Sequence, residues 1–311
     1  MMQYTILKLH ANGNDFLLID EEITPITDDA SRIKLAKLLT DRKNGIGSDG
    51  LVFYQTSKKY DGRMRMFNPD GSEAEMCGNG LRCLGRYAIE KLQKDTIYIE
   101  TNKGFEKVTQ KKLNNSILYE VLFENISLDN ETISRIQLDS FPEIKFSRVS
   151  MPNPHIIATT NNFNLLEEVG KSANSDLKHF SNGINVNFIK ILGRNLLYIR
   201  TYERGAGITL SCGSGNSASS LISCILDICD WNKNISIYND GGIIKCFVNK
   251  LEENRYAVAI LGSVTYVFKS QIKIDDKGNI LKTNIKTYPD EVNEYEESLK
   301  YKNSLIKEYN I

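Results

Sequence analysis

The chain has 311 residues, with 39 basic and 39 acidic side chains, so its formal net charge is zero. This length is enough for two domains with buried cores. The balanced charge argues against a strongly basic nucleic-acid binder and against electrostatic binding to a membrane surface. The sequence contains neither an N-terminal apolar run of signal-peptide length nor a stretch approaching ~18 apolar residues. We therefore expect a cytoplasmic protein that binds neither nucleic acid nor membrane.

Strands dominate the predicted secondary structure, with glycine and asparagine turns between them. The expected helices are, in chain order, residues 31–40, the run after Cys77 to about Leu92, residues 165–172, and the run after Cys212 to about Cys229. The clearest expected strands are residues 51–54, 97–100, 186–189 and 256–260. This mixture predicts an α+β protein whose mostly antiparallel sheet is wrapped around one long helix in each half.

The segment Gly45-Ile46-Gly47-Ser48-Asp49-Gly50 has the spacing of a dinucleotide-binding loop. Such a loop must follow a strand and open a helix. Here a strand-like run follows, starting at Leu51, so we do not assign a nucleotide cofactor to it. Six cysteines and only three histidines occur, without a Cys-x-x-Cys pair, so zinc-site spacing is absent. Four cysteines are expected to be buried small apolar residues rather than disulfide partners: Cys83, Cys224, Cys229 and Cys246.

Two segments of the chain repeat each other. Cys77-Gly78-Asn79-Gly80 and Cys212-Gly213-Ser214-Gly215 each stand at an expected helix start. A polar residue lies nine positions before each cysteine, Asn68 in one segment and Glu203 in the other. The repeat also matches three earlier or later pairs of turns and strands: 14–19 with 153–157, 44–46 with 182–184, and 101–104 with 239–242.

This order of matches predicts two homologous halves that are split near residues 115–145, with a cleft between them. The N-terminal half would be residues 1–118, completed by a strand from about 263–274, and the C-terminal half would be residues 119–262. Residues 275–311 are rich in lysine, glutamate, asparagine and tyrosine, and Pro289 could begin a helix there. This extension could be solvated and weakly packed, or it could be a helix for docking or oligomerisation.

A thiol at a helix N-terminus lies beside unpaired N–H groups and the positive end of the helix dipole, which favours the thiolate. Backbone amides at the following glycines can bind a carboxylate. Two such helix starts facing one α-carbon could remove a proton from one face and add one to the other. Cys77 and Cys212 are therefore predicted to be an acid/base pair that inverts a stereocentre.

Polar residues at matched or flanking turn positions are candidates for binding the rest of the substrate. Arg204 can hold a carboxylate with two hydrogen bonds, and Glu203 beside it can hold an ammonium group. His155 either supports the site or is structural. The candidate asparagines, each of which could also serve the backbone of a turn, are Asn14, Asn68, Asn153 and Asn185.

At these motifs the sequence resembles the diaminopimelate epimerase family. The matching stretches are 12–16, 45–50, 67–83, 153–155, 202–207 and 211–215, and the resemblance spans residues 12 to about 262. It implies a cofactor-independent isomerase, without metal, that interconverts LL- and meso-2,6-diaminopimelate in lysine and cell-wall precursor biosynthesis, and a homodimer of two-halved subunits.

The resemblance also implies a role for each matched residue. Cys77 and Cys212 would be the acid/base pair. Backbone amides at Gly78, Asn79, Gly213 and Ser214 would hold the reacting carboxylate. The remaining substrate contacts would come from Asn14, Asn68, Asn153, Asn185, Glu203 and Arg204, with His155 in support.

The sequence departs from the family pattern at Pro152 and Ile208 and in the length of its tail. These departures leave open a related two-cysteine racemase for another amino acid. A related isomerase without the two thiols and a non-catalytic amino-acid binder are further alternatives, but both cysteines count against them.

Overall fold

The computed structural model describes residues 2–113, 116–127, 135–151, 153–252, 254–275, 277–309 and 311. Pro152, one of the departures from the family pattern, lies outside the described residues. The chain forms two compact units. Unit 1 comprises Met1–Val121 and Ser263–Glu297, and unit 2 comprises Leu122–Gly262 and Ser298–Ile311.

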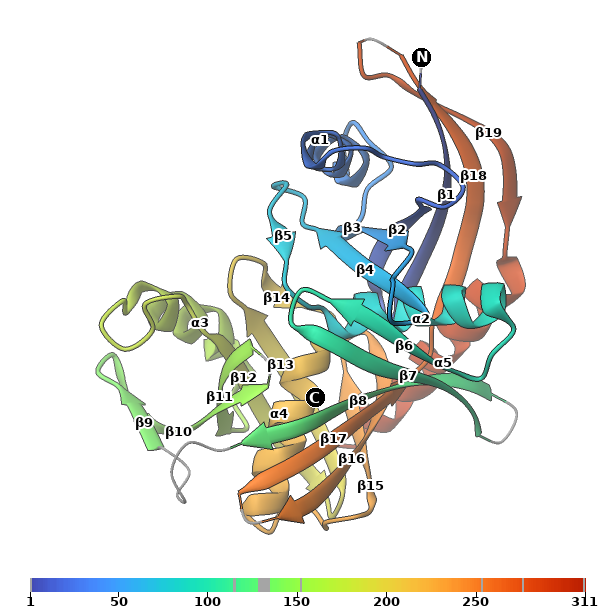
Figure 1. The fold of residues 1–311 in the computed structure, drawn as a ribbon. Helices are drawn as coiled ribbons and strands as arrows, with labels where there is room; N and C mark the ends of the chain where they lie inside the picture. The colour runs from blue at the N-terminus through green and yellow to red at the C-terminus, as the bar shows by residue number, and fades with distance from the viewer. Residues whose placement is uncertain are drawn as a thin grey trace. The chain divides into compact units, whose positions relative to one another are not determined.

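Unit 1 contains most of the strands from the two ends of the chain and two of its helices (Figure 1). Its elements are β1 (Met2–Ala11), β2 (Asn14–Asp20), α1 (Asp29–Thr40), β3 (Gly50–Gln55), β4 (Gly62–Phe67), β5 (Glu73–Ala74), α2 (Gly78–Leu92), β6 (Thr96–Thr101), β7 (Gly104–Leu113), β18 (Thr265–Ile274) and β19 (Ile280–Thr287). Strand β8 (Ser116–Ser127) begins in unit 1 and ends in unit 2.

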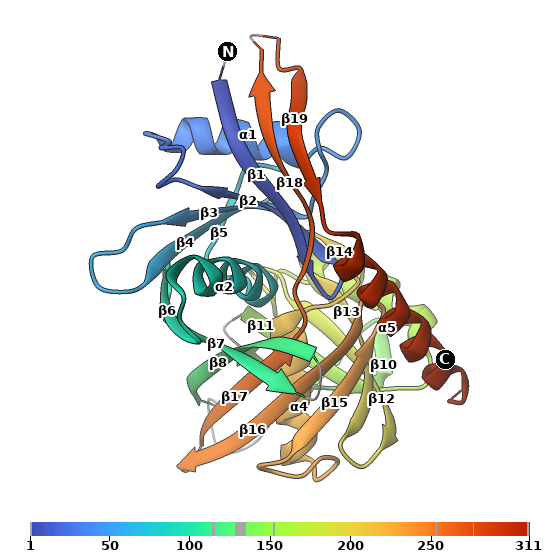
Figure 2. The same ribbon diagram turned by 90° about the vertical axis from the view of Figure 1, so that its right-hand side faces the viewer.

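The first strand of the chain pairs with one of the last. Strand β1 lies antiparallel to β2 on one side and to β18 on the other, with Met2 opposite Ile274 (Figure 2). Strand β19 continues the sheet antiparallel to β18. Strands β2 and β3 are parallel, as are β4 and β6, whereas β3–β4 and β6–β7 are antiparallel. The strand at residues 50–55 confirms that no helix follows the Gly45–Gly50 segment.

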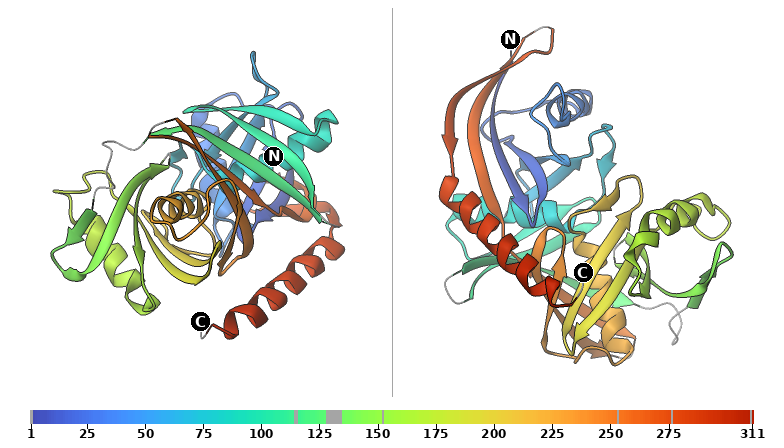
Figure 3. Two further views of the ribbon diagram at one scale, coloured as in Figure 1. Left: turned by 90° about the horizontal axis from the view of Figure 1, so that it is seen from below. Right: turned by 180° about the vertical axis from the view of Figure 1, so that it is seen from behind.

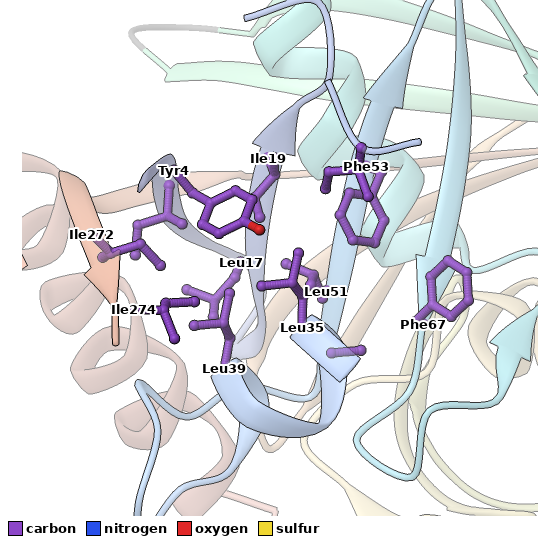
Figure 4. Packing of buried hydrophobic residues seen from close by; sticks show 13 residues of the cluster. Tyr4, Leu17, Ile19, Leu35, Leu39, Leu51, Phe53, Phe67, Ile272 and Ile274 are labelled. Atoms are coloured by element: carbon purple, nitrogen blue, oxygen red, sulfur yellow. The ribbon is translucent and has the colours of Figure 1, made fainter. Parts of the chain in front are cut away.

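A hydrophobic core joins helix α1 to this sheet (Figure 4). Asp28 caps the helix by accepting a hydrogen bond from the backbone N–H of Ser31 (2.8 Å). Leu35 and Leu39 of α1 face Leu51 and Phe53 of β3, and all four side chains are at least 95% buried. Burial of each such side chain stabilises the fold by about 1.5–3 kcal/mol, so this core holds β2 and β3 in place.

Unit 2 contains the middle of the chain. Its elements are β9 (Arg135–Leu138), β10 (Phe141–Met151), β11 (Asn153–Thr159), a short 3₁₀ helix (Phe163–Leu165), α3 (Leu166–Ser175), β12 (Asn185–Gly193), β13 (Leu196–Glu203), β14 (Gly207–Thr209), α4 (Gly213–Ile225), β15 (Asn234–Asn239), β16 (Gly242–Glu252) and β17 (Arg255–Gly262).

Strand pairing in unit 2 follows the same order as in unit 1. Strands β11 and β12 are parallel, like β2 and β3, and β13 and β15 are parallel, like β4 and β6. The pairs β12–β13 and β15–β16 are antiparallel, like their counterparts in unit 1. Helix α4 contacts β10 to β13, β16 and β17 (Figure 3), and α2 contacts β1 to β4, β6 and β7. The chain is therefore a mixed α/β protein with mostly antiparallel strands.

Helix α4 ends earlier than the sequence predicts. It stops at Ile225 rather than near Cys229. Asp227 adopts a left-handed conformation (φ 57°), and the N–H groups of Ile228 and Cys229 both donate back to the carbonyl of Ser223. This turn closes the helix C-terminus. The prediction that Cys83, Cys224, Cys229 and Cys246 are buried is confirmed.

The C-terminal extension forms a docked helix, α5 (Pro289–Lys307), which begins at the predicted proline. Its residues up to Glu297 belong to unit 1, where the ring of Tyr295 packs on that of His10 at 4.3 Å. Its later residues belong to unit 2, where Lys302 and Ile306 are buried. These contacts favour the docked alternative for this helix over the weakly packed one. Among the described residues, no helix is both long and apolar enough to span a bilayer.

Candidate active site

Each of the two repeated cysteines is the residue that caps a helix. The Sγ atom of Cys77 accepts a hydrogen bond from the backbone N–H of Gly80 at the start of α2 (3.4 Å). The Sγ atom of Cys212 accepts one from Gly215 at the start of α4, also at 3.4 Å. The prediction that both thiols stand at helix N-termini is confirmed.

The glycine three residues after Cys212 is required by close packing. A Cβ atom on Gly215 would lie 2.4 Å from Oδ1 of Asn187 and 2.9 Å from Oγ1 of Thr201. Both distances are too short for real contacts, so only glycine lets the first turn of α4 approach β12 and β13 this closely. This approach brings the Cys212 helix start to the polar side chains of those strands.

In unit 1 the structure brings two of the predicted site residues together. Nδ2 of Asn79, in the first turn of α2, donates to Oδ1 of Asn14, at the start of β2 (3.0 Å). Asn14 in turn donates to Oδ2 of Asp49 (2.6 Å). Asn68 lies in the turn before β5, where its Nδ2 donates to Oγ of Ser72 (3.0 Å). Gly78 begins α2 next to Cys77.

A charged network supports Asn14, and the sequence analysis did not identify it. Asp15 and Asp49 exchange backbone-to-carboxylate hydrogen bonds at 3.0 and 3.1 Å, and Arg42 donates to both carboxylates at 2.7 Å. The buried Lys8 also pairs with Asp15. Burial raises the pKa of the Asp15 carboxyl, but the hydrogen bonds and charges of Arg42 and Lys8 outweigh it and lower that pKa to about 2. Asp49 lies within the Gly45–Gly50 segment, which matches the family pattern but supplied no predicted site residue.

In unit 2 a chain of hydrogen bonds leads to the second cysteine. Nε2 of His155 lies 3.1 Å from Oγ of Ser214, and that oxygen lies 3.6 Å from Sγ of Cys212. On the other side of the ring, Nδ2 of Asn187 lies 3.1 Å from Nδ1 of His155. The same Nδ2 donates to the carbonyl of Ile156, and Oδ1 of Asn187 accepts from Thr201 (2.8 Å).

These contacts favour one tautomer of His155. Nδ2 of Asn187 lies closer to Nδ1 (3.1 Å) than Nδ2 of Asn185 lies to Nε2 (3.4 Å), which favours an accepting Nδ1 and a neutral imidazole with its proton on Nε2. Nε2–H can then donate to Ser214, whose hydroxyl is left to donate to Cys212. Asn187 lies two residues after Asn185 on β12, and residues at this spacing share one face of a strand. That spacing could have identified Asn187 from the sequence.

Three further predicted residues belong to unit 2. Nδ2 of Asn185 lies 3.4 Å from Nε2 of His155, and its Oδ1 accepts from the backbone N–H of Arg204 (2.9 Å). The guanidinium of Arg204 donates to the carbonyl of Asn182 (2.8 Å). Asn153 is the first residue of β11, is partly buried, and lies opposite Met151 of β10.

The surroundings of Cys212 favour the protonated thiol. Burial raises its pKa well above the usual value, and the nearby Glu203 carboxylate raises it further. The hydrogen bonds from Ser214 and the Gly215 amide oppose this shift without reversing it. The amide at the helix start thus lowers the pKa of Cys212 as expected, but burial and Glu203 outweigh it. Oε1 of Glu203 also accepts a hydrogen bond from Thr209 (2.6 Å).

Burial lowers the pKa of His155 to about 3, with a smaller contribution from the charge of Arg204. We therefore expect the folded protein to lose stability as the pH falls below 6.5. In that range His155 is protonated in the unfolded chain but stays neutral in the folded protein. The slope should be up to ~1.4 kcal/mol per pH unit between pH 6.5 and 3 for this residue. His155→Gln should remove this contribution, which corresponds to the uptake of one proton on unfolding. The measurement is the unfolding free energy from urea denaturation at a series of pH values.

A matched control for that measurement is Phe188→Leu, a core substitution in the adjacent strand β12. It should lower stability by the same amount at every pH. A His155 imidazole that titrates near pH 6.5 in NMR spectra of the folded protein would contradict the prediction.

Chemically, each unit places a thiol beside the backbone amides of a helix start, and such amides can hold a carboxylate. Within the described parts of the chain, no group of three or more histidine, cysteine, aspartate or glutamate side chains could hold a metal ion.

Comparison with known proteins gives one family. The family profile described as "Diaminopimelate epimerase" matches residues 6–121 and 147–267. The chain is 40% identical over 295 residues to a diaminopimelate epimerase of Clostridium acetobutylicum, which covers 89% of this chain and 88% of that protein. It is 37% identical over 298 residues to one of Ligilactobacillus salivarius, covering 88% and 91%.

Among solved structures, the fold is similar to that of a phenazine biosynthesis protein of the PhzF family from Bacillus anthracis. The TM-score is 0.69 over 88% of this chain and 100% of that chain. The two sequences are only 16% identical, so this likeness supports the fold alone.

Proposed function

The chain belongs to the diaminopimelate epimerase family, and from this premise we propose that it interconverts LL- and meso-2,6-diaminopimelate by proton transfer between two cysteines and one α-carbon. The observation that carries the proposal is the pair of cysteines, each of which caps a helix and accepts a hydrogen bond from a glycine amide. A binding protein would need the amides but not the two thiols.

In the proposed reaction the Cys77 thiolate removes the α-proton from one face of the substrate. The electron pair left on the α-carbon is shared with its carboxylate, whose oxygens are held by backbone amides at Gly78, Asn79, Gly213 and Ser214. The Cys212 thiol then gives its proton to the opposite face, so Cys77 ends as a thiol and Cys212 as a thiolate. The raised pKa of Cys212 supports its role as the starting acid, and the reverse reaction exchanges the two roles.

The second amino-acid head of the substrate would be held by polar side chains from both repeats. Arg204 is suited to its carboxylate and Glu203 to its ammonium group. The remaining contacts would come from Asn14, Asn68, Asn153 and Asn185. His155, buried and neutral, would support Cys212 through Ser214 rather than exchange protons itself.

We further propose that the two units are pseudo-symmetric halves, each with its sheet wrapped around a central helix, and that the substrate binds in a cleft between them. The repeated pairing order supports this arrangement. The protein would act without a cofactor and as a homodimer, as the family resemblance implies. It would be cytoplasmic, because thiol acid/base chemistry requires a compartment that keeps cysteines reduced.

The test is to incubate the reduced protein with LL-diaminopimelate in D₂O without added cofactor. NMR would follow α-hydrogen exchange while chromatography separates the stereoisomers. We expect deuterium at the α-carbon together with meso product. No exchange by a folded, reduced protein would overturn the substrate assignment and favour a two-cysteine racemase for another amino acid.

A further inference from the structure

One charged residue beside the site has no role in the reaction described above. Arg82 lies in α2, five residues after Cys77, and its side chain is wholly buried (0% exposed). Placing a guanidinium in a protein interior is costly unless its partners compensate. Its Nη2 donates to Oδ1 of Asn79 at 2.6 Å.

The repeated helix shows that an arginine is not needed to begin such a helix. Five residues after Cys212, the matching position of α4 is Ser217, whose hydroxyl donates to the carbonyl of Gly213 (3.1 Å). Both helices begin with the same cysteine cap. A structural requirement that is specific to unit 1 therefore explains the buried charge of Arg82.

That requirement is visible in the hydrogen bonds that continue from Asn79. Arg82 donates to Asn79, Asn79 donates to Asn14 (3.0 Å), and Asn14 donates to Asp49 (2.6 Å). A guanidinium can only donate, and an ionised carboxylate can only accept. A chain of amides between a donor-only end and an acceptor-only end has one consistent order, because reversing either amide would place oxygen against oxygen or hydrogen against hydrogen.

We propose that Arg82 and Asp49 are positioning residues that fix the orientation of the Asn79 and Asn14 side-chain amides for substrate binding. The inference rests on the proposed function, in which Asn14 contacts the substrate through its side chain and Asn79 through its backbone amide. In this order of donors and acceptors, Oδ1 of Asn14 points toward α2 and one of its Nδ2 hydrogens is donated to Asp49. The second Nδ2 hydrogen of Asn14 then has a fixed direction and suits an acceptor such as a carboxylate oxygen. Arg42, on the far side of Asp49, holds the acceptor in place without setting the order.

The test compares four variants of the full-length protein: Arg82→Met, Arg82→Lys, Asp49→Asn and Arg42→Gln. Asp49→Asn replaces the acceptor-only end by an amide that can present either atom, so it should raise KM by about tenfold while kcat changes little. Arg82→Met should raise KM at least as much, and Arg82→Lys, which keeps a charged donor, should recover part of the loss. Arg42→Gln removes a charge from the same network but keeps the order, so KM should stay within about twofold.

Asp49 is 42% exposed at its side chain, so its variant tests the proposal even if the buried Arg82→Met chain fails to fold. Unchanged KM in Asp49→Asn would overturn the proposal. In Arg82→Met, a loss in kcat with a shifted pH profile and unchanged KM would also overturn the proposal, because Arg82 would then act on the Cys77 thiol.

A readout independent of turnover separates this inference from the proposed function. In ¹⁵N-labelled protein, one side-chain Nδ2 proton of Asn14, assigned by its absence in Asn14→Ala, should be shifted downfield by the Asp49 carboxylate. Asp49→Asn should remove that shift, whereas Arg42→Gln should keep it. If the wild-type protein leaves diaminopimelate unchanged but these shifts behave as expected, the amide order stands and the substrate assignment fails. If the shift is absent in the wild type, the order itself is wrong.

Discussion

Replacing either Cys77 or Cys212 by serine should lower kcat for epimerisation by roughly three orders of magnitude or more. Serine keeps the cap and its hydrogen bond but ionises far less readily than a thiol, so it can neither remove nor supply the α-proton at neutral pH. The rate of stereoisomer interconversion, measured by chromatography from both isomers, checks this expectation. The structure supports the choice of serine because each Sγ accepts a hydrogen bond from the start of its helix, and a serine hydroxyl can accept the same bond.

The two variants should differ in isotope exchange. Each retains one thiol, which still faces one side of the α-carbon, so each should exchange the α-hydrogen of one stereocentre configuration with D₂O without inverting it. The control is Cys83→Ala, which removes a buried thiol from the same helix as Cys77 and should leave kcat within about twofold. Equal exchange of both isomers by one variant, or full interconversion by either, would contradict the two-thiol mechanism.

Removing the Glu291 carboxylate should destabilise unit 1 by about 2–3 kcal/mol. Glu291 of α5 accepts two hydrogen bonds from Arg86 of α2, at 2.6 and 2.9 Å, and one from the backbone N–H of Tyr266 (2.8 Å). The Arg86 side chain is only 15% exposed and stacks on the ring of Tyr266 at 3.7 Å. Glu291→Ala therefore leaves a mostly buried cation with only the more exposed Glu90 as a carboxylate partner (2.9 Å).

Calorimetry and hydrogen exchange of the amides in α2 and β18 would measure this effect. Glu294→Ala, which removes an exposed carboxylate from the same helix, is the matched control and should change stability by less than about 0.5 kcal/mol. In a double-mutant cycle, Arg86→Met should recover part of the loss, because the mostly buried cation that had lost Glu291 is then absent. Equal effects of Glu291→Ala and Glu294→Ala would show that the tail does not stabilise α2.

The local features of this protein were largely predictable from its sequence. Helix starts at both cysteines, the strand after Gly50 and a helix from Pro289 all followed from caps, periodicity and turn residues. These signals are local because they depend on neighbouring residues and backbone conformation. The family resemblance rested on the same segments, and the profile match agrees with it.

Features that depend on distant residues could not be predicted in the same way. The pKa of Cys212 is set by burial and by Glu203, nine residues earlier, which together outweigh the helix start. The partners of Asn14 come from residues 49 and 79, and only the folded chain brings them together. The docking of α5 depends on Arg86 and His10, which are about 200 or more residues earlier in the chain. Sequence composition alone made this helix look solvated.

The pairing of β1 with β18 has a consequence for the synthesis of the protein. Residue 2 lies opposite residue 274, so this edge of β1 has no partner until residues 265–274 have left the ribosome. At about 5–20 residues per second, this delay is on the order of tens of seconds. During that time the strands of unit 2 up to β17 can already pair, whereas β1 presents an open edge of the kind that other chains can join. We therefore expect the open edge of β1 to be vulnerable to pairing with other chains until β18 has been made.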